Sequence, residues 1–187
     1  MEADVSESAE RYRKIADQFG ARVHSVPDDA WERVAPCEGW VARDVVRHLV
    51  EWVPGFFDSY AGIQFETMPS VDTDPAGAWA ALDRSLRGLL DDPAVAAKEF
   101  DAPPGPTTVE NAVDMFCTGD ILVHTWDLAR ATGLDETLDA EEVHRMFVSM
   151  EPMDEALRSS GQFGPRVAVP EDADEQTKLI AFTGRQP

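Results

Sequence analysis

Apolar residues return every three or four positions along most of this chain, which is the spacing that gives an α-helix one buried face. In the segment 6–26 these apolar positions are Tyr12, Ile15, Ala16, Phe19, Val23 and Val26. The same spacing, or helix start and stop signals, predicts further helices from about residue 41, over 75–92, 109–132 and 140–157, and within 172–185. Four long helices joined by loops favour an all-α fold, an antiparallel four-helix bundle with short additional helices.

Capping residues mark where two of these helices begin and where one ends. Asp74 followed by Pro75 is a typical helix start. Thr108 can cap the helix over 109–132, and Gly133 suits its C-terminal end. These signals fix the expected limits of the third and fourth helices.

Proline residues interrupt the helical pattern in two places. Pro54 lacks the backbone N–H that a helix needs, so we expect the second helix to kink or end there. The segment 93–108 holds four prolines and a glycine, which predicts a long connection with a possible short extended segment over 98–101.

Length and charge limit the class of protein. The 187 residues fit one domain, 1–187, and include 16 Lys and Arg against 36 Asp and Glu, a net charge of −20. This charge repels nucleic-acid phosphates and anionic membrane surfaces, so we expect neither as a partner. No signal-peptide pattern and no apolar run of about 18 residues is present, which predicts a cytoplasmic protein. Small molecules, and a second copy of the chain in a homodimer, remain as partners.

The two cysteines, Cys37 and Cys117, are far apart in the sequence and form no CxxC pair. Their spacing argues against a disulfide framework and against a thiolate zinc site. We interpret each as a small buried apolar residue. Cys117 also falls near the polar residues described next, where it would be either a bystander or a modulator of a bound metal ion.

The segment DILVHTWDLARATG, residues 120–133, places polar side chains on the buried face of its helix. At about 100° per residue, Asp120, His124 and Asp127 fall on the same side as the surrounding apolar residues. Asp120 and His124 are four positions apart and point the same way from adjacent turns. A buried carboxylate is costly unless it is paired, hydrogen-bonded or bound to a metal ion, so Asp120 needs a partner.

His48 occupies the apolar stripe of the second helix, which in a bundle can face the helix that carries Asp120 and His124. Two histidines and one carboxylate form a three-ligand set that leaves a coordination position open for water or substrate. Zn²⁺ suits these ligands best, with Fe²⁺ or Ni²⁺ as alternatives. The other interpretation is a buried network in which the three side chains only hydrogen-bond to one another.

Three other polar residues have competing interpretations, and two histidines are expected at the surface. Asp127 would orient a ligand histidine, the role that we favour, or hydrogen-bond a backbone group. Asp44 has the same alternatives, or it complements the dipole of its helix as an acid in the first turn. Arg130 would form a salt bridge or anchor an anionic substrate. His24 and His144 lie off the apolar faces of their helices, which predicts solvated surface residues.

Three segments together resemble one known family: WERVAPCEGWVARDVVRHLVEW, DILVHTWDLARATG and FGPRVAVPEDADEQTKLIAFTGRQP. They are similar to the mycothiol-dependent, maleylpyruvate isomerase N-terminal-like proteins of the DinB-like superfamily. The resemblance implies a DinB-like four-helix bundle with a divalent metal ion, usually zinc, held by His48, Asp120 and His124. Asp120 stands where the isomerase is expected to use Glu, and Val41 stands where related sequences often have Thr or Ser as a helix cap.

The resemblance also implies a reaction. Members of the family with a known reaction use a low-molecular-weight thiol in isomerisation or in transfer of the thiol to an electrophile. We therefore predict a metal-dependent enzyme that activates a mycothiol-like thiol for transfer to, or isomerisation of, a small electrophile. Of the two, a thiol transferase fits better. The isomerase has a further C-terminal domain that this chain is too short to contain, so we do not expect maleylpyruvate as the substrate. The alternative is a non-catalytic DinB-like module that binds a metal ion or a small ligand.

Overall fold

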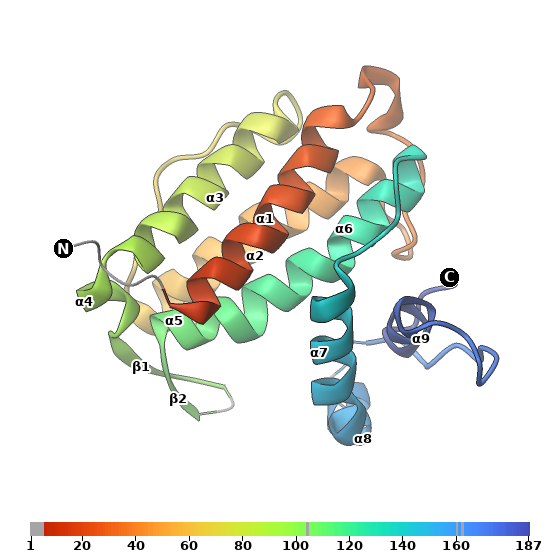
Figure 1. Cartoon of the computed structure of the whole chain (residues 1–187). Coiled ribbons are helices and arrows are strands. Elements are labelled where there is room, and N and C mark those ends of the chain that lie inside the picture. The colour runs from red at the N-terminus through yellow and green to blue at the C-terminus, as the bar shows by residue number, and fades with distance from the viewer. Residues whose placement is uncertain (1–5, 104, 160, 162) are drawn as a thin grey trace.

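The computed structural model describes residues 6–103, 105–159, 161 and 163–187. Four long helical segments form a bundle (Figure 1): α1 (Glu7–Ser25), α2 (Ala42–Ala61), α3 (Pro75–Asp91), and a fourth made of α5 (Val109–Ala112), a π-helical segment (Val113–Thr118) and α6 (Gly119–Thr132). Helix α1 packs against α3 and α6, and α2 packs against the same two helices. The predicted all-α four-helix bundle is confirmed.

The apolar stripes of these helices form the core between them. All six apolar positions expected in the first helix are buried. Helices α2 and α3 contribute further buried side chains: Val45, Leu49, Val53, Phe57, Trp79, Leu82 and Leu86. Each large apolar side chain that is removed from water contributes about 1.5–3 kcal/mol, so burial of the stripes is the main force that holds the bundle together.

The helix limits follow the capping residues. Oδ1 of Asp74 accepts a hydrogen bond from the backbone N–H of Gly77, and Oγ1 of Thr108 accepts one from Asn111. Gly133 has a φ of 76°, a left-handed conformation that ends α6 without strain in a residue that lacks Cβ. The predicted starts of α3 and α5 and the predicted end of α6 are therefore confirmed.

Helix α2 corrects one expectation. We expected the helix to kink or end at Pro54, but it continues through Pro54 to Ala61, so the alternative that it ends there is wrong. Proline removes a single hydrogen bond, whereas Val53 and Phe57 on either side of it are fully buried. Packing of this apolar face outweighs the lost bond, and the helix ends at Gly62 instead, where φ is 61°.

The connection after α3 contains a short helix and a hairpin. Helix α4 (Pro93–Ala96) leads into β1 (Glu99–Ala102), which pairs antiparallel with β2 (Gly105–Thr108). The extended segment expected over 98–101 is therefore present, shifted by one residue. The second strand was not predicted, because Gly-Pro-Thr-Thr is short and lacks alternating apolar residues.

The fourth helical segment contains a wide turn directly before α6. Its ends agree with the predicted range 109–132, but the π-helical segment Val113–Thr118 was not predicted. A π-helical turn takes up more residues than an α-helical turn, so it rotates the following helix relative to the preceding one. Asp120 is the second residue of α6, and the wide turn therefore sets the direction in which Asp120 and His124 point.

The C-terminal third packs beside the bundle (Figure 1). It contains α7 (Ala140–Met150), a 3₁₀ turn (Glu151–Met153), α8 (Asp154–Ser159) and α9 (Glu175–Phe182), and a further 3₁₀ turn (Asp28–Ala30) precedes α2. Helix α7 contacts α9 and, through fewer residues, α6. Among the residues that the structure describes, no helix has both the length and the apolar character needed to cross a membrane.

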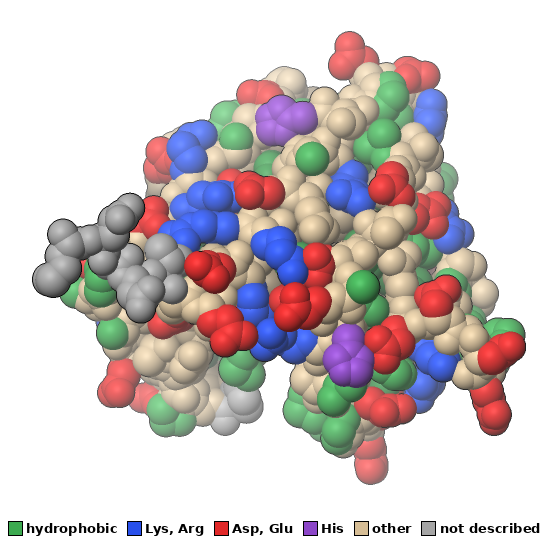
Figure 2. Space-filling view, viewed as in Figure 1, with side chains coloured by type: hydrophobic (Ala, Val, Ile, Leu, Met, Phe, Trp, Pro, Cys, Tyr) green, Lys and Arg blue, Asp and Glu red, His purple; other side chains and the backbone are tan. Residues whose placement is uncertain are grey.

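Ion pairs join α7 to the bundle. Acidic and basic side chains are interspersed over the face that carries α1, α3 and α7 (Figure 2). The guanidinium of Arg11 lies 2.7 Å from the carboxylate of Glu142 and 2.7 Å from that of Asp114. Lys14 lies 3.0 Å from Asp139. Because the Glu142 side chain is only 3% exposed, its pair with Arg11 is a buried contact between α1 and α7.

Candidate metal centre

Helices α2 and α6 bring together the three residues that were predicted as metal ligands. Nε2 of His48 lies 3.1 Å from Oδ2 of Asp120. Nε2 of His124 lies 3.4 Å from Oδ1 of the same carboxylate. Asp120 therefore sits between the two histidines, one from each helix.

The contacts at the start of α2 show the role of Asp44 and how the helix begins without a Thr or Ser cap at Val41. The backbone N–H of Val41 donates to Oδ2 of Asp44 at 3.0 Å, and Nε of Arg47 donates to Oδ1 at 3.1 Å. Asp44 is thus an acid in the first turn of its helix and contacts none of the three candidate ligands. Its carboxylate compensates for the missing Thr or Ser cap at Val41.

Trp52 holds the candidate ligand Asp120 from α2. Its indole N–H donates a hydrogen bond of 2.9 Å to Oδ2 of Asp120. This role was not predicted, although its signal is local. Trp52 follows His48 by four positions and therefore lies on the same helix face. Oδ2 of Asp120 is shared by His48 and Trp52, whereas Oδ1 faces His124.

Asp127 forms a hydrogen bond with the second ring nitrogen of His124. Its side chain is fully buried, and its Oδ2 accepts a hydrogen bond of 2.8 Å from Nδ1 of His124. The contact agrees with the role that we favoured for Asp127, since its partner is the histidine ring and not a backbone group. With Nδ1 as the donor, Nε2 is the nitrogen that faces Asp120.

Two residues from distant parts of the chain complete this cluster. Nε of Arg185 lies 2.8 Å from Oδ1 of Asp127, and Nη2 lies 2.8 Å from Oδ2. The thiol of Cys37 donates to Oδ2 of Asp127 at 3.5 Å. Cys37 is therefore a half-buried, hydrogen-bonded residue, and its interpretation as a purely apolar residue was wrong. Neither contact was predicted, because each joins segments that only the folded chain brings together.

Charge pairing governs the proton affinities in the cluster. Burial alone would raise the pKa of Asp120, but the charge of His124 and hydrogen bonds with both histidines outweigh it and lower that pKa well below its usual range. Burial alone would lower the pKa of His124, but Asp120 and Asp127 outweigh it and raise that pKa to about 9. The imidazole of His124 thus carries a positive charge at neutral pH when its only partners are the two carboxylates.

The two cysteines are poor nucleophiles at neutral pH. Burial, followed by the charge of Asp127, raises the pKa of Cys37 to about 12. Cys117 is fully buried, and burial together with the charge of Asp120 raises the pKa of its thiol well above its usual range. The expectation that Cys117 is a small buried residue agrees with this position.

Tryptophan rings enclose the two histidines. Trp40 stacks on His124 with ring centroids 5.8 Å apart and planes at 20°, and it also lies 5.1 Å from the ring of His48. The side chains of His48 and Asp120 are nevertheless 33% and 29% exposed, whereas that of His124 is 5% exposed. The cluster is therefore open on the side of His48 and Asp120 and closed around His124.

The spacing of the three side chains suits a tetrahedral ion. Bonds of about 2.0–2.2 Å to nitrogen and oxygen place neighbouring ligand atoms of such an ion about 3.3–3.6 Å apart. Nε2 of His48 lies 3.1 Å from Oδ2 of Asp120, and Nε2 of His124 lies 3.4 Å from Oδ1, so each histidine is near this spacing from a different carboxylate oxygen. One ligand atom from each residue lies within 4.8 Å of the others. Asp120 reaches both histidines despite being shorter than the Glu expected from the family pattern.

The remaining polar residues lie apart from this cluster. Arg130 pairs with Glu136 at 2.7 Å and covers the ring of Trp126, which agrees with the salt-bridge interpretation. His24 and His144 are exposed, as predicted, and contact a backbone carbonyl and Glu175 respectively.

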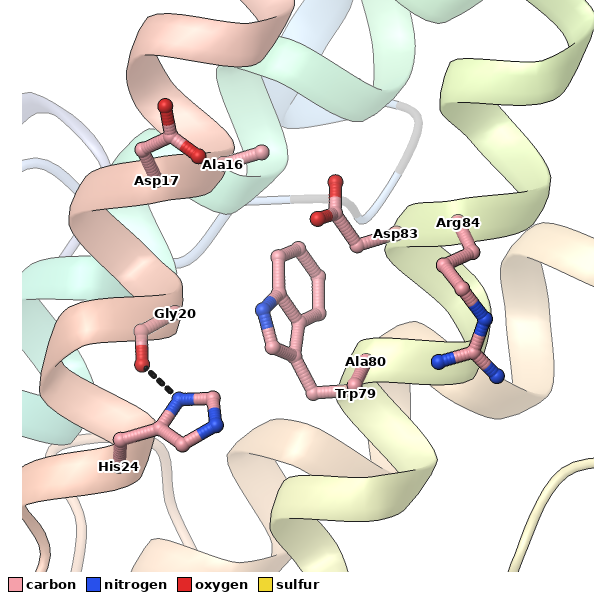
Figure 3. A pocket seen from close by; sticks show the side chains of 8 residues that line it. All are labelled: Ala16, Asp17, Gly20, His24, Trp79, Ala80, Asp83 and Arg84. Carbon is pink, nitrogen blue, oxygen red and sulfur yellow. Dashed lines mark hydrogen bonds between the residues drawn. The ribbon is translucent and has the colours of Figure 1, made fainter.

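Two surface pockets are separate from the candidate metal centre. One of about 280 Å³ lies between α1 and α3, where Trp79, Asp83 and His24 are among the residues that line it (Figure 3). Another of about 200 Å³ is lined by charged residues of α1 and α7. Neither lining includes His48, Asp120 or His124.

An all-α bundle with two histidines and an aspartate converging between two of its helices defines a helical-bundle protein with a candidate metal centre. Residues 12–74 match the family model of the mycothiol maleylpyruvate isomerase N-terminal domain, which confirms the resemblance for this part of the chain. The matched range contains His48, whereas Asp120 and His124 lie beyond it.

Two relatives from Mycobacterium tuberculosis match over most of the chain. Uncharacterized protein MT0763 of strain CDC 1551 / Oshkosh is 26% identical over 179 residues, which cover 93% of this chain and 95% of that protein. Uncharacterized protein Rv0738 of strain ATCC 25618 / H37Rv matches with the same identity and coverage. No solved structure matches the chain.

Proposed function

We propose that His48, Asp120 and His124 bind a divalent metal ion, Zn²⁺ in preference to Fe²⁺ or Ni²⁺, and that the protein uses it to activate a low-molecular-weight thiol. The observation that carries the proposal is the convergence of three metal-binding side chains beside a partly exposed opening. Three protein ligands leave one position of a tetrahedral ion available, as in catalytic zinc sites. The ion would supply a Lewis acid that lowers the pKa of a thiol bound there.

The surrounding residues have positioning roles in this proposal. Trp52 holds Oδ2 of Asp120 and leaves Oδ1 directed toward His124. Asp127 holds Nδ1 of His124, so that Nε2 is the nitrogen available to the ion. Trp40 packs against both rings and limits the approach of water from that side.

The thiol in this proposal comes from outside the protein. Burial keeps both Cys37 and Cys117 protonated at neutral pH, so neither supplies a thiolate. The name of the matched family connects that domain with mycothiol, and a mycothiol-like thiol is therefore the co-substrate that we propose. The sulfur would attack a small electrophile, and its proton would pass to solvent. In transfer, a carbon–sulfur bond would form while the electrophile releases a leaving group as an anion, such as chloride, or, in an addition, while it takes up a proton from solvent. In isomerisation, the thiol would add to a double bond and be eliminated again after rotation, so that it is regenerated.

One experiment tests this function directly. Zinc-loaded protein is incubated with mycothiol and 1-chloro-2,4-dinitrobenzene as a model electrophile, and conjugate formation is followed by absorbance. We expect a protein-dependent rate that disappears on chelation and in His124→Ala, and persists in His144→Ala. Zinc binding without any turnover, across a panel of electrophiles, would contradict the enzyme and favour a non-catalytic metal-binding module. Absence of zinc binding would contradict both.

A further inference from the structure

Asp127 and Arg185 form one rigid unit although they are 58 positions apart in the sequence. A carboxylate with a fully buried side chain requires a charged or hydrogen-bonding partner. Arg185 contacts both of its oxygens, Nε with Oδ1 and Nη2 with Oδ2, each at 2.8 Å. This two-point contact fixes the plane of the carboxylate as well as its charge, which a single-point contact would not do.

The fixed carboxylate in turn fixes the ring of His124. Nδ1 of His124 donates to Oδ2 of Asp127 at 2.8 Å. A rotation of the imidazole would break this bond inside a buried site, because the His124 side chain is only 5% exposed. The orientation of Nε2 toward Asp120 therefore depends on the position of Asp127, and through it on Arg185.

Cys37 makes a second cluster of potential ligands on the other side of the same ring. Ligand atoms of Cys37, His124 and Asp127 lie within 4.8 Å of one another. Nη2 of Arg185, however, donates to Sγ of Cys37 at 3.4 Å while it also binds Asp127. A cation placed between this sulfur and the carboxylate would meet the positive guanidinium, so Arg185 closes this second position electrostatically.

The turn after α9 places Arg185 for both contacts. Gly184 has a φ of 89°, and a Cβ at this position would lie 3.0 Å from the Cα of Gly164, so only glycine is accommodated. The next residue, Arg185, donates its backbone N–H to the carbonyl of Ile180 at 3.2 Å. The glycine turn therefore directs the arginine side chain back toward α6.

The geometry points to Arg185 as a positioning and selectivity residue of the metal centre: through Asp127 it fixes the ring of His124, and it keeps Cys37 from becoming a metal ligand. This inference rests on the proposed metal-binding function. It assigns a role in that site to the C-terminal segment, and it keeps a competing ion from the position beside Cys37 on the other side of the His124 ring. A position that includes a thiolate ligand would favour softer metal ions.

The first test uses metal-free protein and does not depend on metal binding. Long-range ¹H–¹⁵N correlation NMR of the histidine rings reports whether Nδ1 of His124 carries a hydrogen-bonded proton. We expect this signal in the wild type and in Arg166→Met, a control on the same C-terminal segment whose guanidinium lies over the ring of Phe182. We expect it to shift or exchange rapidly in Arg185→Met and Arg185→Gln. Identical His124 signals in all four proteins would overturn the positioning role.

The second test uses Co²⁺ in place of zinc, because a cobalt–thiolate bond gives a strong near-ultraviolet absorption band. We expect no such band in the wild type, and a band in Arg185→Met that disappears in Arg185→Met/Cys37→Ser. We also expect metal affinity about 10–100-fold weaker in Arg185→Met than in Arg166→Met, the usual effect of losing a group that orients a ligand. If Arg185→Met does not fold, Arg185→Gln, which keeps a hydrogen-bond donor, replaces it in each comparison.

The outcomes separate this inference from the function on which it rests. Metal binding by the wild type with unchanged affinity and no thiolate band in the Arg185 variants would overturn the inference and leave the metal site intact. A wild type that binds neither zinc nor cobalt would contradict the proposed function and with it the selectivity role. The NMR comparison in metal-free protein would then still decide whether Arg185 positions His124.

Discussion

The indole N–H of Trp52 donates a hydrogen bond of 2.9 Å to Oδ2 of Asp120, the oxygen that also lies 3.1 Å from Nε2 of His48. Trp52 follows His48 by one turn on α2. The same face of α2 therefore supplies the candidate ligand His48 and the indole group that holds the candidate ligand Asp120. The remaining oxygen of Asp120 is directed at His124 on α6. The orientation of this carboxylate is therefore set by the helix that it faces.

Replacing Trp52 tests that contact. Trp52→Phe keeps an aromatic ring but removes the N–H donor, and we expect zinc affinity to fall by about tenfold, at the lower end of the effect of losing such a partner. Competition with a chromophoric chelator measures the affinity. Trp31→Phe is the control, because Trp31 is also a buried tryptophan but its side chain has no hydrogen bond or ring contact with the three candidate ligands among the described residues. Equal affinities in the two variants would show that the hydrogen bond does not position Asp120.

Removing Arg11 tests the attachment of α7 to the bundle. Arg11→Met leaves the carboxylate of Glu142, only 3% exposed, without its closest positive partner. We expect the free energy of unfolding to fall by about 3 kcal/mol, as for other buried ion pairs that lose one member. Urea denaturation measures the change.

The matched control for Arg11 is an exposed pair. Arg84 and Glu66 lie 3.0 Å apart with side chains 65% and 52% exposed. Arg84→Met should change the stability by less than about 1 kcal/mol. A loss as small as this in Arg11→Met would mean that Glu142 has sufficient partners without Arg11, and the ion pair would not hold α7 in place.

The reactivity of Cys37 should follow its raised pKa. Burial and the charge of Asp127 raise that pKa to about 12, so the thiol stays protonated through neutral and mildly alkaline pH. We expect the rate of alkylation of Cys37 by iodoacetamide to rise about tenfold per pH unit between about pH 7 and pH 10, because only the thiolate reacts. Mass spectrometry of peptides separates Cys37 from the fully buried Cys117. A rate that levels off below about pH 9 would contradict the effect of burial.

Most of the fold was predictable, because the signals for a helix are local in the sequence. The spacing of Tyr12, Ile15 and Phe19 gives the buried face of α1, and Asp74 with Pro75 gives the start of α3. The helix does not end at Pro54, because the cost of one missing hydrogen bond is local, whereas the burial of Val53 and Phe57 that outweighs it depends on neighbouring helices. The π-helical segment Val113–Thr118 was also not predicted, because no proline or glycine within it indicates a change in helix type.

The three residues of the candidate site could be predicted for the same reason, because their signals are local. His48, Asp120 and His124 each occupy an apolar helix face, so their inward direction follows from helical spacing alone. The partners that hold them were not predictable. Arg185 reaches Asp127 across 58 positions, and Cys37 reaches it across 90, so the sequence around each residue gives no sign of the contact. Trp52 is the exception, because its distance of four positions from His48 is a local signal.

The central claim is that His48, Asp120 and His124 bind a divalent metal ion, and elemental analysis by inductively coupled plasma mass spectrometry tests it most directly. Untagged wild type is compared with His48→Ala, His124→Ala and the exposed control His144→Ala. The account predicts close to one zinc or other divalent ion per chain in the wild type and in His144→Ala, and loss of the ion in the other two. A wild type that stays metal-free after incubation with zinc, or equal occupancy in all four proteins, would contradict it.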